Sequence, residues 1–186
     1  MRCFRALLAS ALALPGGALA QGTAPLGLPS LRITELNGEP AACLPPGNPP
    51  LELVGVMVAT LDGDWPPEQW GIKLNAGHLP MTLKPGQCVR YHQSLPGYAQ
   101  EGRDLPLKDG ETYGFAMRRM HSEGHWADGL YLSVFCLERG ADGKRHVRPY
   151  IQHEDESTTY PTCGRYIGWK PAPDGIMPPG YSPPVD

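Results

Sequence analysis

Short stretches in which apolar and polar residues alternate recur along the chain, separated by turn-forming residues. Residues 31–36 alternate Leu and Ile with Arg and Thr, and residues 70–74 alternate Trp, Ile and Leu with Gly and Lys. Residues 51–61 carry apolar side chains at both parities, which is typical of a central strand. Residues 88–92 form another short run of strand type. The recurrence of such runs at intervals of about ten residues predicts an all-β sandwich rather than a barrel.

Residues 107–113 (LKDGETY) contain the sharpest local signal. Their L-x-x-G-x-x-Y spacing resembles the tyrosine corner of Greek-key sandwiches, in which the tyrosine hydroxyl bonds back to the backbone of the crossing connection. Gly110 would adopt the turn conformation that other residues resist. We therefore expect Tyr113 to have a structural role, and the motif refines the predicted fold to an Ig-like Greek-key β-sandwich.

A hairpin is predicted towards the end of the domain. Residues 131–138 and 145–152 both have strand character, and the Asp142-Gly143 dipeptide between them is favoured in tight hairpin turns. The predicted sandwich domain spans residues 31–168.

Two segments flank this domain. Residues 21–30 show no periodicity and are expected to be a flexible lead-in. Residues 169–186 contain six prolines, so we expect an extended, mobile tail.

Composition supports the β prediction and excludes several classes of protein. The chain has 23 Gly and 22 Pro among 186 residues, which is too many helix-breaking residues for a helical bundle or a wound α/β domain. Its formal net charge is −3 and 19% of its residues are charged. These values exclude a basic nucleic-acid-binding protein and a charge-rich disordered chain.

The first twenty residues have the pattern of a secretory signal peptide. Arg2 and Arg5 form a positive n-region, residues 6–14 form a stretch that is apolar apart from Ser10, and small residues precede an expected cleavage site before Gln21. The apolar run is shorter than the roughly 20 residues of a membrane-spanning helix. We therefore expect a periplasmic protein that is not embedded in the membrane. The absence of a cysteine at the cleavage site argues against a lipid anchor.

Four cysteines follow the predicted cleavage site: Cys43, Cys88, Cys136 and Cys163. An even number in an exported protein indicates two disulfides. Three connectivities are open, and we prefer Cys43 with Cys88 and Cys136 with Cys163, because each pair closes a moderate loop within one half of the chain. No CxxC spacing is present, so a zinc ribbon or thioredoxin-type site has little support.

The sequence contains no G-x-S-x-G, H-E-x-x-H or P-loop motif, and we predict neither enzymatic activity nor a cofactor. His121 and His125, with Met117, Met120 and Asp128 nearby, would suit a soft copper site. A periplasmic protein that binds copper or a small ligand is therefore the alternative hypothesis. The preferred interpretation of this segment is a polar hairpin loop.

Two loops combine tryptophans with charged residues, as protein-recognition loops do. They are residues 62–68 and 121–129. The acidic run at residues 153–156 is expected to be a solvated loop that could also steer a basic partner. The candidate partner-binding residues are Asp64, Trp65, Glu68, His121, His125 and Trp126.

The order of these motifs resembles a known family. Cys43 followed by Leu, the PMTLKPGQC segment at residues 80–88, the motif at 107–115 and the strand at 131–136 resemble small periplasmic type VI secretion immunity proteins over residues 31–136. Members commonly look like lipoproteins, whereas this chain lacks the lipobox cysteine. The resemblance implies a non-enzymatic protein that binds a toxic effector delivered into the periplasm and occludes its active site. It transfers no binding residue.

Overall fold

A computed structural model describes residues 30–61, 66–120 and 129–183. These residues form antiparallel strands and turns without an α-helix, so the all-β prediction is confirmed. Within the same residues, no helix is long and apolar enough to span a membrane.

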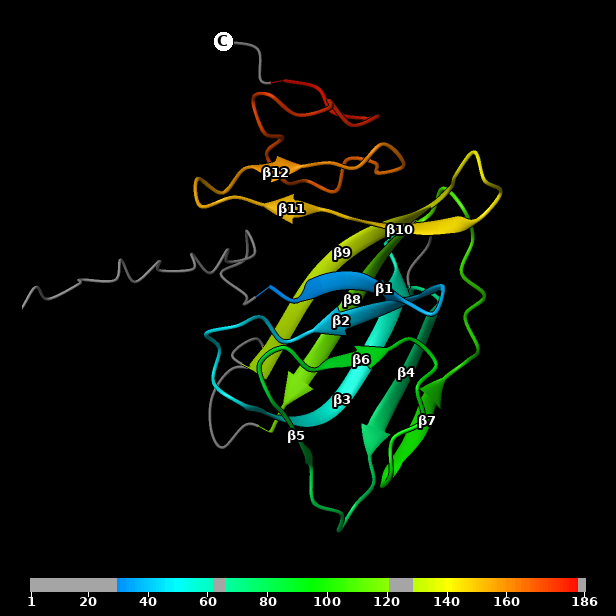
Figure 1. Ribbon diagram of the computed structural model, residues 1–186, viewed down its shortest axis with the longest axis vertical. Coiled ribbons are helices and arrows are strands. Elements are labelled where there is room, and N and C mark those ends of the chain that lie inside the picture. The colour runs from blue at the N-terminus through cyan, green and yellow to red at the C-terminus, as the bar shows by residue number, and fades with distance from the viewer. Residues whose placement is uncertain (1–29, 62–65, 121–128, 184–186) are drawn as a thin grey trace, which may run out of the picture.

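A small three-stranded sheet forms one layer of the molecule (Figure 1). Its strands are β1 (Arg32–Leu36), β2 (Glu39–Cys43) and β6 (Cys88–Arg90), in the order β1-β2-β6. The β1–β2 hairpin turns at Asn37 and Gly38, which have φ values of 56° and 80°. Asn-Gly is favoured in such turns because both residues tolerate positive φ.

A large sheet forms the second layer, and β3 (Leu51–Thr60) lies in its interior. Over most of its length β3 is paired on both sides, as its apolar residues at both parities predict. The strand order is β10 (Arg145–Pro149), β9 (Leu130–Arg139), β8 (Thr112–Arg119), β3, β4 (Gln69–Leu74) and β7 (Tyr98–Gly102), with β5 (Met81–Leu83) also paired to β3.

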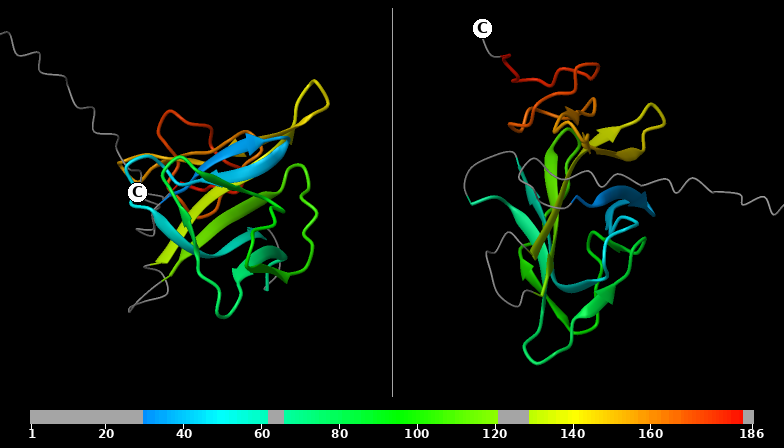
Figure 2. Two further views of the ribbon diagram at one scale, coloured as in Figure 1. Left: turned by 60° about the horizontal axis from the view of Figure 1, so that its bottom comes forward. Right: turned by 90° about the vertical axis from the view of Figure 1, so that its left-hand side faces the viewer.

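The small sheet packs on one face of the large sheet, here called the inner face, as the edge-on view in Figure 2 shows. Ile33 and Val89 from the small sheet share one core with Phe115, Met117 and other inward-facing residues of the large sheet. Burying each large apolar side chain stabilises the fold by about 1.5–3 kcal/mol. The two sheets therefore form a β-sandwich-like domain.

The connection between β7 and β8 is fastened by two buried tyrosines. The Lys108 backbone N–H donates to the Tyr113 hydroxyl over 2.7 Å, and that hydroxyl donates to the Glu111 carboxylate over 2.9 Å. The Tyr91 hydroxyl donates to the Leu105 carbonyl. Burial raises the pKa of Tyr113 well above its ordinary value. The predicted structural role of Tyr113 is confirmed, and Gly110 has the expected left-handed conformation, with φ 81°.

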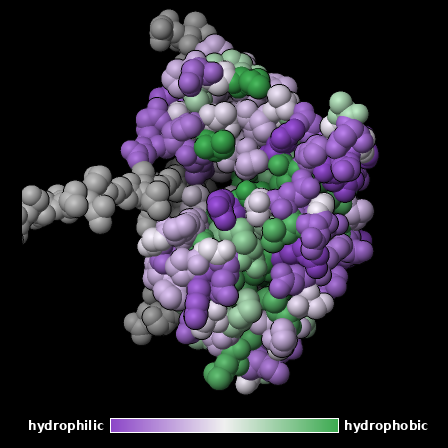
Figure 3. Space-filling view, in the orientation of Figure 1, coloured by the Kyte–Doolittle hydropathy of each residue, from purple (hydrophilic) through white to green (hydrophobic). Residues whose placement is uncertain are grey.

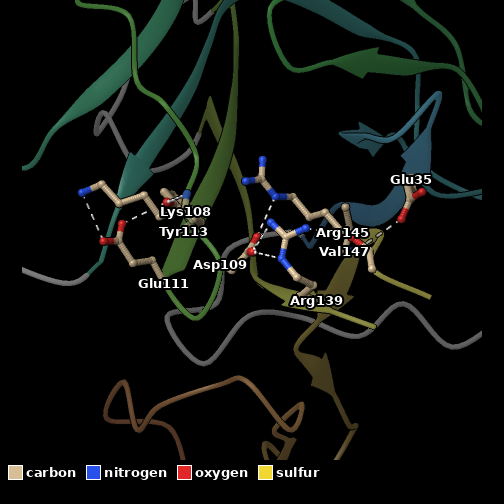
Figure 4. Close-up of polar contacts among 9 residues, drawn as sticks. Glu35, Lys108, Asp109, Glu111, Tyr113, Arg139, Arg145 and Val147 are labelled. Atoms are coloured by element: carbon tan, nitrogen blue, oxygen red, sulfur yellow. Dashed lines mark hydrogen bonds and ion pairs between the residues drawn. The ribbon is translucent and has the colours of Figure 1, made fainter. Parts of the chain in front are cut away.

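An exposed ion-pair cluster adds to this fastening (Figure 4). Asp109, in the connection, accepts hydrogen bonds from Arg139 and Arg145, each over 2.8 Å from Nε. These two arginines flank the β9–β10 turn, so Asp109 ties the connection to that hairpin.

Both disulfides have the preferred connectivity. Cys43–Cys88 joins directly paired positions of β2 and β6 within the small sheet. Cys136–Cys163 joins β9 to the C-terminal segment. Two disulfides fit a protein exported to an oxidising compartment.

Residues 150–183 form a separate layer at the upper end of the molecule in Figure 1, here called the C-terminal module. It contains β11 (Ile151–Gln152) and β12 (Thr158–Thr159). The predicted strand at 145–152 is thus divided between two sheets.

Part of the expected tail lies beside β12 in this module. Thr158 N–H donates to the Lys170 carbonyl over 2.8 Å, and Ala172 N–H donates to the Thr158 carbonyl over 2.9 Å. Pro171, between them, has no N–H to donate, but the residues around it supply both a donor and an acceptor. Residues 170–172 are therefore part of the folded structure rather than an extended, mobile tail.

Candidate functional site

Most of the partner-binding residues predicted from the sequence lie outside the described residues. This applies to five of them: Asp64, Trp65, His121, His125 and Trp126. Glu68 is described and is exposed just before β4, where its backbone carbonyl accepts from the Thr60 N–H over 3.0 Å.

The two predicted recognition loops are attached at opposite ends of the large sheet. At the upper end, Thr60 is paired with Tyr113, and the chain after β3 leaves there. At the lower end, the Met120 N–H donates to the Glu52 carbonyl over 2.8 Å. Glu52 and Thr60 are eight residues apart on β3, which corresponds to about 26 Å along a strand. The structure therefore does not bring the attachment points of these loops together.

The outer face of the large sheet, opposite the core, is divided into two halves. At its upper end Val134 and Cys136 of β9 pack against Tyr150 and Tyr160 of the C-terminal module. The Thr112 and Tyr150 hydroxyls are hydrogen-bonded over 3.2 Å. The module therefore covers the upper half of this face.

The lower half of the outer face contains a hollow of about 530 Å³, here called the outer hollow. Gly55, Gly71 and Ala116 form part of its lining, on three adjacent strands. A Cβ atom at Gly71 would lie 2.9 Å from the Val56 carbonyl oxygen. Glycine is therefore required at this point of close backbone approach, and the small side chains lower the floor between taller neighbours.

Apolar and charged side chains surround this floor in different places. Met57, Met120 and Leu130 supply apolar surface, and Met120 is 51% exposed. Lys73 and Glu101 stand at the β4–β7 side with their charged atoms 4.0 Å apart, and both are largely exposed. Such an exposed pair contributes little to stability. An apolar centre with a rim of both charge signs is the usual anatomy of a protein-binding patch.

A second hollow, of about 400 Å³, lies beside the turn that follows β6. His92 there has φ 58°, stacks on Tyr91 with ring centroids 3.8 Å apart, and places Nε2 2.8 Å from the Asp104 carboxylate. The pair joins the turn to the β7–β8 connection. Trp70 lines the same hollow but is 2% exposed, which places it in the core, in keeping with the alternation of residues 70–74.

Ser94 also lines this second hollow. A nucleophilic site would need its hydroxyl to be hydrogen-bonded to the imidazole. Among the described residues, the polar contact of the His92 ring is with Asp104. The contacts that are present therefore describe a structural tie between two loops.

The methionines of the copper hypothesis do not converge. Met117 is fully buried in the sandwich core on the inner face, whereas Met120 lines the outer hollow on the other face. His121, His125 and Asp128 lie outside the described residues. Within the described ranges, no group of three or more His, Cys, Asp or Glu side chains could hold a metal ion.

The acidic run at residues 153–156 lies at the turn between β11 and β12. Asp155 accepts hydrogen bonds from the Ser157 hydroxyl over 2.6 Å and from the Ser157 N–H over 3.1 Å. These bonds hold the pKa of Asp155 below its ordinary value. The run is exposed, as expected for a solvated turn.

The outer hollow was not predicted from the sequence, although a signal for it exists. A small residue occupies an outward position on each of three strands: Gly55 in β3, Gly71 in β4 and Ala116 in β8. In each strand taken alone, the small residue only interrupts the row of larger outward-facing side chains. The strand order is needed to place these positions side by side.

Comparisons with protein-family models, with curated proteins and with solved structures found no match to this chain. The functional interpretation therefore rests on the geometry of the outer face and on the sequence.

Proposed function

We propose that this chain is an exported, non-enzymatic binding protein of the immunity type. Its partner is a toxic effector directed to the periplasm, which it neutralises by covering the effector's active site. The observation that carries this proposal is the outer hollow: a concave, partly apolar surface on the lower half of the large sheet, over which the described residues place no second layer.

The outer face of an antiparallel sheet is normally polar where it meets water. Here Met57 and Leu130 are partly exposed at outward positions around the hollow, Ala116 is buried in its floor, and Met120, which also lines it, is exposed. Exposed apolar surface of this kind marks interaction sites more often than it serves the monomer. A protein partner would bury this surface and meet the charged rim.

Rigidity of the surface also supports this function. The hollow lies on strands of the large sheet, whose backbones are held in place by hydrogen bonds to the neighbouring strands. Two disulfides and the tyrosine-fastened connection restrict the rest of the domain that supports this sheet. A pre-organised surface loses less conformational entropy on binding, which favours tight association.

An Ig-like Greek-key sandwich is part of this proposal. β2 pairs with β6, β3 pairs with β8, and β8 forms a hairpin with β9. These pairings match those of strands B with E, C with F, and F with G in the Ig fold. Tyr113 would then be at the start of strand F, where the tyrosine corner occurs.

Expression experiments test the function. The neighbouring gene should encode a secreted effector, and expression of the chain with residues 1–20 should protect cells against that effector when it is directed to the periplasm. Expression without residues 1–20 should not protect, because neither the disulfides nor the encounter would form in the reducing cytosol. Equal protection by the form without residues 1–20 would contradict the proposed compartment.

Substitutions in the outer hollow test the surface. Ala116→Phe would fill the hollow and Met120→Asp would place a charge in it, and each should weaken effector binding by about tenfold or more. Arg32→Phe, at an exposed position on the small sheet, is the matched control and should bind normally. Circular dichroism and melting temperature check that each variant folds. Unchanged binding by both hollow variants would show that the effector uses another face.

A further inference from the structure

The turn between β4 and β5 carries an unusually exposed leucine. Leu79 is 91% exposed, whereas the other exposed large apolar side chains among the described residues are at most 55% exposed. The turn projects from the lower end of the molecule (Figure 1), and the space-filling view shows apolar surface at this tip (Figure 3). Holding a leucine this far into water gives the monomer no burial energy.

The backbone of this turn is held in place by several contacts. Asn75 N–H donates to the Gly97 carbonyl over 2.9 Å, and His78 N–H donates to the Asn75 carbonyl over 3.1 Å. The His78 ring lies directly over Gly97, where a Cβ atom would come within 3.0 Å of Nδ1.

After the turn, Met81 N–H donates to the Tyr98 hydroxyl over 3.0 Å, and that hydroxyl donates to the Leu53 carbonyl over 2.5 Å. The chain is thus fixed on both sides of Leu79. The leucine is presented on a pre-organised support, which lowers the entropic cost of inserting it into a partner.

The turn is continuous with the outer hollow. Asn75, Ala76, Gly77 and His78 line that hollow, and Leu79 follows them directly in the chain. A projecting apolar side chain therefore stands at the edge of a concave apolar surface. Together they form one surface with a protrusion and an adjoining recess.

We infer that residues 75–80 form a plug that enters an apolar cleft of the effector, with Leu79 as its anchor. This inference rests on the proposed function and specifies how the effector is contacted. A narrow, rigid turn ending in a leucine fits a concave protein surface, and buried central side chains of this kind dominate binding energy. Insertion of the plug at or beside the effector's active site would block substrate access.

Charge favours a protein cleft over a membrane surface as the site of insertion. Residues 74–83 contain no Lys, Arg, Asp or Glu, and the chain as a whole carries a net charge of −3. Membrane-surface segments combine apolar residues with Lys and Arg that attract anionic lipids. An uncharged tip is instead easily desolvated in an apolar protein pocket.

The test compares Leu79 with Met177, an exposed apolar residue of the C-terminal module at the other end of the molecule. Full-length mature Leu79→Ala, Leu79→Asp, Met177→Ala and Met177→Asp would be titrated against the purified effector encoded by the neighbouring gene. We expect Kd to rise about tenfold for Leu79→Ala and about a hundredfold or more for Leu79→Asp. Both Met177 variants should bind like the wild type, and inhibition of the effector should follow binding.

The outcomes separate this inference from the function on which it rests. If the wild type binds the effector and Leu79→Asp binds equally well, the plug is wrong and the proposed function stands. If the wild type does not bind the effector, both are overturned. Leu79-dependent binding to vesicles of phosphatidylethanolamine and phosphatidylglycerol, without effector binding, would replace the protein cleft with a membrane surface.

Discussion

The sandwich and the C-terminal module are held together by different means. The sandwich core is a cluster of 22 buried side chains drawn from both sheets and their connections in the described residues. The module has a cluster of four buried residues, two of which, Val134 and Cys136, belong to β9 of the sandwich. The module therefore supplies two buried side chains to this cluster, and its Tyr166, Ile167 and Trp169 pack against them partly buried.

A disulfide and hydrogen bonds from tyrosines also hold the module in place. Cys136–Cys163 fixes the module to β9. Tyr150 donates to the Arg165 carbonyl over 3.0 Å, and Tyr160 donates to the Trp169 carbonyl over 2.8 Å. Each tyrosine thus supplies a packed ring and a hydrogen bond to a loop that lacks regular strand pairing. Segments too small to build a core commonly depend on such disulfides.

The largest effect is expected from removing the disulfide of the module. Replacing Cys136 and Cys163 by Ala should cost about 3–4 kcal/mol by chain-entropy arithmetic, and the loss should fall mainly on the module. Hydrogen exchange should accelerate at the Thr158 and Ala172 amides while the β3 amides remain protected.

The control for this prediction is replacement of Cys43 and Cys88 by Ala, which should destabilise the sandwich as one cooperative unit. Equal acceleration of exchange in both regions by the Cys136/Cys163 variant would mean that the module and the sandwich unfold together. The distinction between them would then be lost.

An intermediate effect is expected at the tyrosine corner. Tyr113→Phe keeps the buried ring but removes the hydroxyl that accepts from Lys108 N–H. Leaving this contact unmade should lower the free energy of unfolding by about 1–2 kcal/mol in urea denaturation. The loss of stability should appear in the sandwich. Hydrogen exchange of the module's amides should accelerate only as far as it depends on global unfolding. The matched control is Tyr181→Phe, because the Tyr181 ring is partly buried in the module. This substitution should change the free energy of global unfolding little.

The smallest effect concerns acid pH and exposed carboxylates. Hydrogen bonds from Arg145 and Arg139 lower the pKa of Asp109 from its ordinary value of 3.8. Hydrogen bonds from Thr162 and Arg148 lower the pKa of Glu138 from 4.5. A lowered folded-state pKa gives a contribution that is present above the unfolded-state value and is lost as pH falls through the folded-state value.

Stability should therefore be level from neutral pH to about pH 5 and decline below it. Asp109→Asn should reduce the loss of stability at acid pH that is measured for the sandwich. Glu138→Gln should reduce the loss that is measured at the module, because Thr162, which donates to Glu138, belongs to the module. Denaturation at a series of pH values with exchange readout distinguishes the two. A decline that neither variant alters would assign the acid sensitivity to other groups.

Local chemistry allowed several parts of the fold to be predicted from the sequence. Tyr113 and Gly110 have the predicted roles because a corner motif depends on neighbours a few residues away. Gly143 has φ 75°, as a tight hairpin turn requires. The disulfide connectivity followed from loop lengths. The strand β2 was missed because residues 39–43 are buried without alternation, although Asn37-Gly38 before it is itself a hairpin signal.

Tertiary structure decided the features on which function depends. The parity of a strand determines which residues share a face, so alternation along the sequence could indicate an all-β chain, and the even number of cysteines after residue 20 could indicate two disulfides. Parity does not determine which strands are neighbours, and the outer hollow exists because Gly55, Gly71 and Ala116 come from strands adjacent in the order β8-β3-β4.

The antiparallel pairing of β3 with β8 places the attachment points of the two predicted recognition loops at opposite ends of the large sheet. Cys136 faces outward on β9, and this orientation lets Cys163 of the C-terminal module form a disulfide with it. The module can then cover the upper half of the outer face. Contacts between residues distant in the chain are set by the packing of the whole domain, whereas turns, corners and alternation are set by neighbouring residues.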